Sequence, residues 1–227
     1  MKLSVVIPVY NEKPTLETLV KRVLAVKISK EVILVDDAST DGSRELVKKL
    51  SKQPNIRAIF HDRNQGKGMA IRSGIKEARG DYIIIQDADL EYDPQDYFKL
   101  LKPIKEGKAE VVYGSRFTGE HRNMFFWHWV ANQFLTLVTN ILYNTTLSDM
   151  ETCYKAFNRP ALDKIKNKLT ASRFGIEPEI TALVAKNNLR IYEVGISYFG
   201  RTYQEGKKIG WKDGVAAIWH ILKSNLS

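Results

Sequence analysis

The sequence predicts an α/β protein built on a mostly parallel sheet with helices on both faces. Three observations support this fold class. Short apolar runs alternate with longer segments of helical apolar spacing through the first half of the chain. The apolar runs are continuous, as in strands that are buried on both faces of a sheet. The chain of 227 residues is long enough for one large domain, and no linker or repeat divides it.

The elements of the first half follow one another regularly. In chain order we expect a strand at 3–10, a helix at 15–26, a strand at 31–37, a helix at 39–52, a strand at 56–61, a helix at 66–78 and a strand at 81–89. The helix at 39–52 opens with Ser39, Thr40 and Asp41, whose side-chain oxygens suit an N-cap.

The second half is less regular. Here we expect a strand at 110–117, a helix at 125–145, a helix at 177–188, a strand at 190–198 and an amphipathic C-terminal helix at 210–224. The helix at 125–145 is apolar and aromatic but is interrupted by polar side chains: His128, Asn132, Gln133, Thr136 and Asn140. This helix and the C-terminal one fit either packing in a core or dimer, or a position on a membrane surface.

Charge and cysteine content restrict the setting of the protein. The formal net charge is +9, which favours nucleic acid, anionic membrane surfaces or phosphorylated ligands as partners. The single cysteine, Cys153, excludes an internal disulfide and is predicted to be a packing residue. The N-terminal apolar run is too short for a signal peptide, and no segment has the ~20 apolar residues of a membrane span. We expect a cytoplasmic protein, peripheral at the inner face of the membrane.

Polar residues follow the ends of the predicted strands. These residues are Asn11, Glu12, Asp36, Asp37, Asn64, Asp87 and Asp89. Ligands of open parallel sheets bind beyond the carboxyl ends of the strands, so these side chains should converge on one edge. Asp87 and Asp89 repel each other unless a cation or proton intervenes, and Mg²⁺ or Mn²⁺ prefers such oxygen ligands. We favour a metal site there over a solvated acidic turn.

Three further positions are candidates for binding. Asp37 can accept hydrogen bonds from a nucleobase or a ribose, as acids after a strand do in dinucleotide folds. Lys67 lies between two glycines at a helix start, where backbone amides and the helix dipole also suit an anion, so it is a candidate for nucleotide-sugar binding. Arg116 and the loop that holds Arg201 and Lys207 could neutralise a diphosphate and a second anion. For any single lysine a solvated surface is the better interpretation, whereas for Arg116 and Arg201 we favour a functional role.

Eight motifs occur in order along the chain. They are SVVIPVYNE, VILVDDASTDGS, NQGKG, IIIQDADLEYDP, YGSRF, NQFLTLVTNIL, LSDMETCYKAF and RTYQEGKKIG. Together they resemble the family 2 inverting glycosyltransferases, in particular the branch of dolichyl- and polyprenyl-phosphate mannose or glucose synthases. The resemblance implies a GT-A fold with a Rossmann-like sheet over residues 1–227. Residues 1–115 would bind the nucleotide sugar and residues 116–227 the acceptor.

The resemblance also implies a role for each matching residue. The residues of the nucleotide-sugar site would be Pro8, Tyr10, Glu12, Asp37 and Asp87. The residues near Mg²⁺ or Mn²⁺ would be Asp87, Asp89 and Glu91. The catalytic residues would be Asp89, Arg116, Arg201 and Lys207. The residues that hold the acceptor phosphate would be Arg116, with Arg122 and His128 where relatives carry other arginine and serine contacts.

The predicted reaction is metal-assisted transfer of a hexose from a nucleotide-diphosphate sugar, UDP-glucose-like or GDP-mannose, to a polyprenyl or dolichyl phosphate. A phosphate acceptor is already anionic and needs no general base, and no nucleic-acid partner is expected. One alternative is transfer to a saccharide hydroxyl in cell-surface glycan synthesis, which needs a base. Asp149 and Glu177 are the candidates for that base. Another alternative is a non-catalytic nucleotide-sugar binding module.

Overall fold

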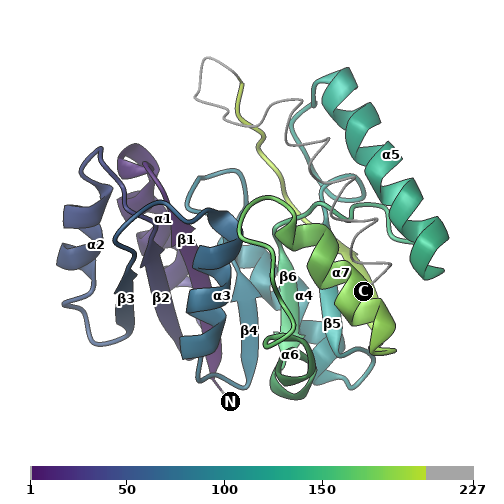
Figure 1. Ribbon diagram of the computed structural model, residues 1–227, viewed down its shortest axis with the longest axis horizontal. Coiled ribbons are helices and arrows are strands. Elements are labelled where there is room, and N and C mark those ends of the chain that lie inside the picture. Colours follow the sequence, from purple (N-terminus) through teal and green to yellow (C-terminus); the bar gives the residue numbers. More distant parts are fainter. Residues whose placement is uncertain (1, 203–227) are drawn as a thin grey trace.

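A seven-stranded sheet with the strand order β3-β2-β1-β4-β6-β5-β7 forms the centre of the computed structural model (Figure 1), which describes residues 2–202. The strands are β1 Leu3–Val9, β2 Lys30–Asp36, β3 Ile56–Phe60, β4 Tyr82–Ile85, β5 Val111–Ser115, β6 Lys155–Asn158 and β7 Ile191–Gly195. Only β6 runs antiparallel to its neighbours in the described sheet. The prediction of a mostly parallel sheet is therefore confirmed.

Helices cover both faces of this sheet. They are α1 Lys13–Ala25, α2 Ser43–Leu50, α3 Lys67–Glu77, α4 Tyr97–Lys105, α5 Phe126–Tyr143, α6 Arg159–Ile165 and α7 Ile176–Lys186, with a 3-10 turn at Pro94–Asp96. In Figure 1, α3, α6 and α7 lie in front of the strands and α1 lies behind them. The helix α5 stands at the end of the molecule away from β3, and none of the described helices is both long and apolar enough to cross a bilayer.

Two predicted boundaries were wrong for local reasons. The second helix begins at Ser43 rather than near residue 39, because Gly42 before it has a left-handed backbone with φ of 95°. Asp41 still serves the helix start, since its Oδ1 accepts a hydrogen bond from the Ser43 amide at 2.9 Å. The fourth strand ends at Ile85 instead of continuing to residue 89.

The strand β6 was not predicted, because Lys155 interrupts its apolar run. The Lys155 side chain is buried, and its Nζ donates to the carbonyl oxygen of Met150 at 2.8 Å. The ammonium also lies 4.6 Å from the centroid of the Tyr113 ring. A buried lysine that meets carbonyl oxygens and an aromatic face in this way is compatible with a strand between β4 and β5. The helices α4 and α6 were also missed.

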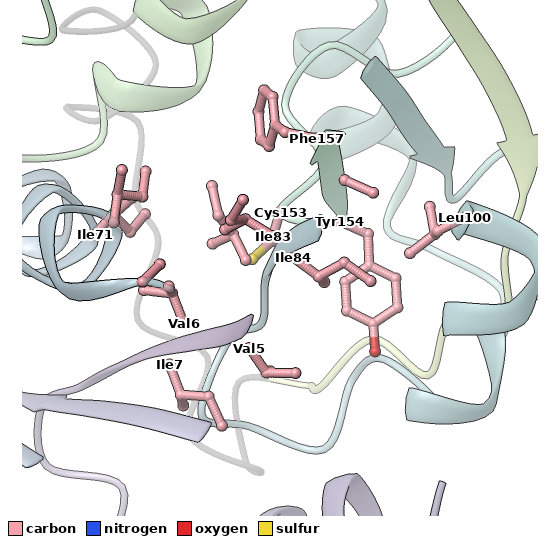
Figure 2. Close-up of a cluster of buried hydrophobic side chains, with 14 of the residues drawn as sticks. Val5, Val6, Ile7, Ile71, Ile83, Ile84, Leu100, Cys153, Tyr154 and Phe157 are labelled. Carbon is pink, nitrogen blue, oxygen red and sulfur yellow. The ribbon is translucent and has the colours of Figure 1, made fainter. Parts of the chain in front are cut away.

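The core lies between the sheet and its helices. Figure 2 shows side chains of β1, β4, α3 and α4 meeting there, with the Cys153 sulfur among them. Cys153 is buried, so its prediction as a packing residue is confirmed. The predicted C-terminal helix at 210–224 and Lys207 lie outside the described residues.

Candidate active site

The polar residues that follow β1, β2 and β4 share one edge of the sheet. The three strands are parallel neighbours. Val9 at the end of β1 lies beside Asp36 at the end of β2, whereas β4 ends earlier, with Ile85 beside Val6. Pro8 lies inside β1, whereas Tyr10 lies just beyond it with 43% of its surface exposed. The predicted convergence of polar residues at this edge is confirmed for the strand ends.

Asp37 organises the loop before α3. Its Oδ1 lies 2.7 Å from His61 Nδ1 and accepts from the Gln65 amide at 2.8 Å, and its Oδ2 accepts from the Gly66 amide at 2.7 Å. The side chain is almost fully buried. In this state both carboxylate oxygens bind the protein itself, so Asp37 contacts a nucleoside only if one of these bonds is exchanged. Its nucleotide-binding role remains a prediction.

Lys67, the first residue of α3, joins two carboxylates, one in the loop after β4 and one in α7. Its Nζ lies 2.9 Å from Asp87 Oδ1 and 2.8 Å from Glu177 Oε1. Burial opposes the charge of this ammonium, but the two carboxylates more than offset that effect and raise the pKa of Lys67. Lys67 therefore fixes the position of Asp87, and its ammonium is available to a bound anion only through exchange with these acids.

Arg201 connects the end of β7 to the acidic loop after β4. Its Nη2 donates to Asp89 Oδ2 at 3.0 Å and its Nε to Glu91 Oε1 at 3.2 Å. Its Nη1 also reaches Glu12 Oε2 at 3.4 Å. Tyr198, three residues earlier, donates its hydroxyl to Glu91 Oε2 at 2.8 Å. These contacts place Arg201 beside the predicted metal-site acids Asp89 and Glu91, and its catalytic role remains a prediction.

Asp89 carries the strongest electrostatic signal of the site. Its side chain is buried, and this burial raises its pKa to about 8, with further contributions from the nearby carboxylates of Asp87 and Glu91. The positive charge of Arg201 lowers this pKa. A carboxyl group so strongly opposed to ionisation at neutral pH is a common feature of functional sites.

The described residues could supply some of the ligands of a divalent cation but not a complete set. No group of three or more acidic, histidine or cysteine side chains is arranged to hold a metal within residues 2–202. Mg²⁺, however, is commonly held by one or two carboxylates together with substrate phosphates. Asp87 and Asp89 offer two carboxylates whose charges are now balanced by Lys67 and Arg201. Glu91 is engaged by Tyr198 and Arg201, which makes it the least available of the three predicted ligands.

Arg116 is held in a bidentate ion pair below α5. Its Nε and Nη2 each lie 2.7 Å from an oxygen of Asp149, and Nη2 also donates to Asn132 Oδ1 of α5 at 3.3 Å. The guanidinium carbon lies 5.5 Å from the centroid of the Tyr198 ring. Burial opposes the charge of Arg116, but Asp149 outweighs it and raises the pKa of Arg116. No acceptor for its Nη1 is found in the part of the chain that the structure describes.

The other predicted acceptor residues lie just before α5, at Arg122, and in its first turn, at His128. The Arg122 amide donates to the Tyr198 carbonyl oxygen at 2.9 Å, and the His128 ring lies 5.8 Å from the Phe125 ring. The acceptor role of these two residues remains a prediction. Asn132 is the α5 residue that reaches Arg116. Its place in a polar series with Thr136 and Asn140, four residues apart, was the sequence signal that could have identified the inward face of α5.

Comparison with known proteins identifies relatives of the whole chain. Residues 4–166 match the family described as Glycosyl transferase family 2. A UDP-N-acetylglucosamine–dolichyl-phosphate N-acetylglucosaminyltransferase of Methanococcus voltae is 29% identical over 97% of this chain and 94% of its own length. A dolichol-phosphate mannosyltransferase of Pyrococcus furiosus is 37% identical, but over 52% of this chain and 34% of its own length.

Solved structures show the same fold at low sequence identity. Glucosyl-3-phosphoglycerate synthase of Mycobacterium tuberculosis, in complex with Mn²⁺, UDP and glucosyl-3-phosphoglycerate, superposes with a TM-score of 0.75 and 18% identity. The match covers 98% of this chain and 79% of that one. The S. aureus TarS structure with UDP gives a TM-score of 0.65 at 18% identity, covering 99% and 65% of the two chains. The fold is GT-A, as expected.

Proposed function

We propose that this chain, which belongs to glycosyl transferase family 2, transfers a hexose from a nucleotide-diphosphate sugar to a polyprenyl or dolichyl phosphate. Its family makes it a glycosyltransferase rather than a non-catalytic binding module. The proposed mechanism is inverting, with direct attack of the acceptor phosphate oxygen on the anomeric carbon and departure of the nucleoside diphosphate. Relatives whose names include dolichyl phosphate or undecaprenyl phosphate support this choice of acceptor.

The main support for a phosphate acceptor is the way in which the two candidate general bases, Asp149 and Glu177, are bound in the structure. Asp149 is fully buried and both its oxygens bind Arg116, while Glu177 is buried against Lys67. A general base must come within hydrogen-bond reach of the proton that it removes. Asp149 cannot meet a sugar hydroxyl without losing its ion pair, and the second oxygen of Glu177, Oε2, is buried away from solvent although no described group binds it. An acceptor that arrives already anionic requires no such base, and Arg116, the partner of Asp149, is a cation that could bind it.

A divalent cation would be held by Asp87 and Asp89 together with the donor diphosphate. When bound, Mg²⁺ or Mn²⁺ would neutralise the charge that develops on the leaving diphosphate. The chain itself would supply Arg201 beside the same carboxylates and Arg116 for the acceptor. Lys207, which lies outside the described residues, is proposed to assist at the diphosphate.

The reaction can be tested with labelled donors and a short polyprenyl phosphate. The protein would be incubated with Mn²⁺ and radiolabelled UDP-glucose, GDP-mannose or UDP-N-acetylglucosamine, the last because a relative of the whole chain is named for it. Label that enters the organic phase only when polyprenyl phosphate is present is the expected result. Label transferred instead to a water-soluble saccharide would favour the alternative with a hydroxyl acceptor. Donor binding without any turnover would contradict the proposal.

The orientation of α5 favours contact with a lipid surface. Its polar face points inward: Thr136 Oγ1 accepts from the Met150 amide at 3.1 Å, and Asn140 Oδ1 accepts from the Leu147 amide at 3.0 Å. The opposite face exposes Trp127, Phe134 and Ile141, with 76%, 53% and 72% of their surfaces accessible. These residues are seven positions apart and therefore share one face of the helix. Aromatic side chains beside a lipid-phosphate site, in a chain of net charge +9, fit an anionic membrane surface better than water.

Loss of this apolar face should weaken membrane binding. The double variant Trp127→Ser, Ile141→Ser is expected to bind vesicles of equal parts phosphatidylcholine and phosphatidylglycerol at least about 100-fold more weakly, since each buried apolar side chain contributes about 1.5–3 kcal/mol. Phe98→Ser is the control, because Phe98 is 46% exposed on α4. Co-sedimentation with vesicles measures the change. Equal binding by all three proteins, or loss of a dimer in sedimentation analysis instead, would refute the lipid surface as the partner of α5.

A further inference from the structure

The guanidinium of Arg201 occupies a cation position among three carboxylates. Glu12 comes from the turn before α1, and Asp89 and Glu91 come from the loop after β4. The guanidinium nitrogens lie 3.0–3.4 Å from one oxygen of each of these acids. The Arg201 amide also donates to Glu91 Oε1 at 2.9 Å, so main chain and side chain are anchored at the same place. With 21% of its side chain exposed, Arg201 fills this position rather than lying over it.

Arg201 and a divalent cation need the same atom. Asp89 Oδ2 is the oxygen that Arg201 Nη2 approaches at 3.0 Å. The other oxygen, Oδ1, accepts the Glu91 amide at 3.1 Å. Mg²⁺ lies about 2.0–2.1 Å from its ligand oxygens and demands nearly ideal geometry around itself. A guanidinium that stays in its present position would therefore meet the cation at short range, with like charges repelling in a partly buried site.

We propose that Arg201 stands in for the metal while the donor site is empty and has to leave Asp89 before a metal and nucleotide can bind. The inference rests on the proposed function, because it assigns the metal to Asp89. It adds that metal binding by this protein is a cation exchange. The released guanidinium becomes available to the diphosphate of the donor. Arg201 therefore neutralises the charge of the acids before the donor binds and the charge of the diphosphate afterwards.

The exchange needs only a side-chain movement. Tyr198 donates its hydroxyl to Glu91 Oε2 at 2.8 Å, and the Phe199 amide donates to the Glu91 carbonyl oxygen at 2.8 Å. These bonds attach the segment before Arg201 to the acidic loop without using Asp89. Arg201 can turn away from Asp89 while the segment keeps its place. The acid cluster then remains assembled for the metal.

Removal of Arg201 should tighten the binding of Mn²⁺ in the absence of nucleotide. We expect Arg201→Ala and Arg201→Gln to bind Mn²⁺ about tenfold more tightly than the unmodified protein, the effect expected when a partly buried competing ion pair is lost. The control is Arg190→Ala, which removes the same charge from an exposed pair with Glu110 at the other end of β7. Electron paramagnetic resonance of free Mn²⁺ measures the affinities. Adding Asp89→Asn to Arg201→Ala should abolish the gain.

An unchanged or weaker Mn²⁺ affinity in both Arg201 variants would overturn the exchange, as would a gain that survives the Asp89→Asn change. Absence of Mn²⁺ binding to every variant would overturn it as well. The transfer assay described above separates this inference from the proposed function. Transfer by the unmodified protein without any tightening in the Arg201 variants would refute the exchange alone. Tightening without transfer to polyprenyl phosphate would support the exchange and count against the proposed reaction.

Discussion

Replacement of Asp89 with alanine is expected to lower the rate of sugar transfer by about 1000-fold or more while the protein stays folded. A metal that neutralises the leaving diphosphate supplies several kcal/mol of transition-state stabilisation, and each ~1.4 kcal/mol is a factor of ten in rate. Burial, Asp87, Glu91 and Arg201 all influence the pKa of Asp89. The measurement is transfer of labelled sugar to polyprenyl phosphate across a range of Mn²⁺ concentrations.

The fold should survive this change because burial and the neighbouring acids oppose the ionisation of Asp89 more strongly than its ion pair with Arg201 favours it. Burial and neighbouring acids raise its pKa to about 8 in the folded state, above the value of an unfolded aspartate. A raised pKa contributes stability that is fully present below the pKa of an unfolded aspartate, about 4, and that is lost progressively until the pH passes about 8. The melting temperature of Asp89→Asn relative to the unmodified protein should therefore rise between about pH 4 and pH 8, and at pH 8 the variant should melt no lower than the unmodified protein.

A neighbouring carboxylate provides the matched control. Asp93 lies on the same loop, and its Oδ1 accepts a hydrogen bond from the Gln95 amide at 2.9 Å, at the start of the 3-10 turn. Asp93→Asn removes the same charge without touching the acid cluster and should keep transfer within about threefold of the unmodified rate, since surface changes of this kind have small effects. Full activity of Asp89→Ala, with unchanged dependence on Mn²⁺, would remove the metal role from this acid.

The strand ends were predictable because burial on both faces leaves a simple signal. The strands β1, β2 and β4 read as continuous apolar runs, and the rule for parallel sheets then places the residues after them at one edge. The resemblance of the ordered motifs to family 2 glycosyltransferases led to the correct family and fold. A strand such as β6 escaped the same reasoning because one buried lysine breaks its apolar run.

The pairing of the charged groups could not be predicted from the sequence. Arg201 meets Asp89 across 112 positions of the chain, and Arg116 meets Asp149 across 33. Such pairs depend on how elements that are distant in the sequence pack together, and local periodicity in the sequence does not indicate this packing. For this reason Asp149 was considered as a general base, whereas the structure makes it the counter-ion of Arg116. The bonds of Asp37 to the loop before α3 are of the same long-range kind, and its role at a nucleoside remains a prediction.

Replacement of Arg116 with lysine should separate acceptor binding from donor chemistry. Arginine binds a carboxylate and a phosphate through a rigid fork that lysine cannot reproduce. We expect kcat/KM for polyprenyl phosphate to fall about 100-fold, a loss of the size expected when a charged, geometrically matched contact is removed. The KM of the donor and the slow hydrolysis of the donor by water should stay unchanged, because Arg116 lies with Asp149 and Asn132 rather than with the acids after β4.

The lysine variant is preferable to Arg116→Ala, which would leave Asp149 buried without a counter-ion and cost about 3–5 kcal/mol of stability. Arg44→Lys is the control for the general effect of weakening a buried ion pair. Arg44 donates to the buried Asp36 at 2.9 Å, near the opposite end of the sheet. Both variants should melt below the unmodified protein, but only Arg116→Lys should lose acceptor-dependent transfer. An equal loss in the two variants, or a rise in donor KM confined to Arg116→Lys, would mean that Arg116 does not hold the acceptor phosphate.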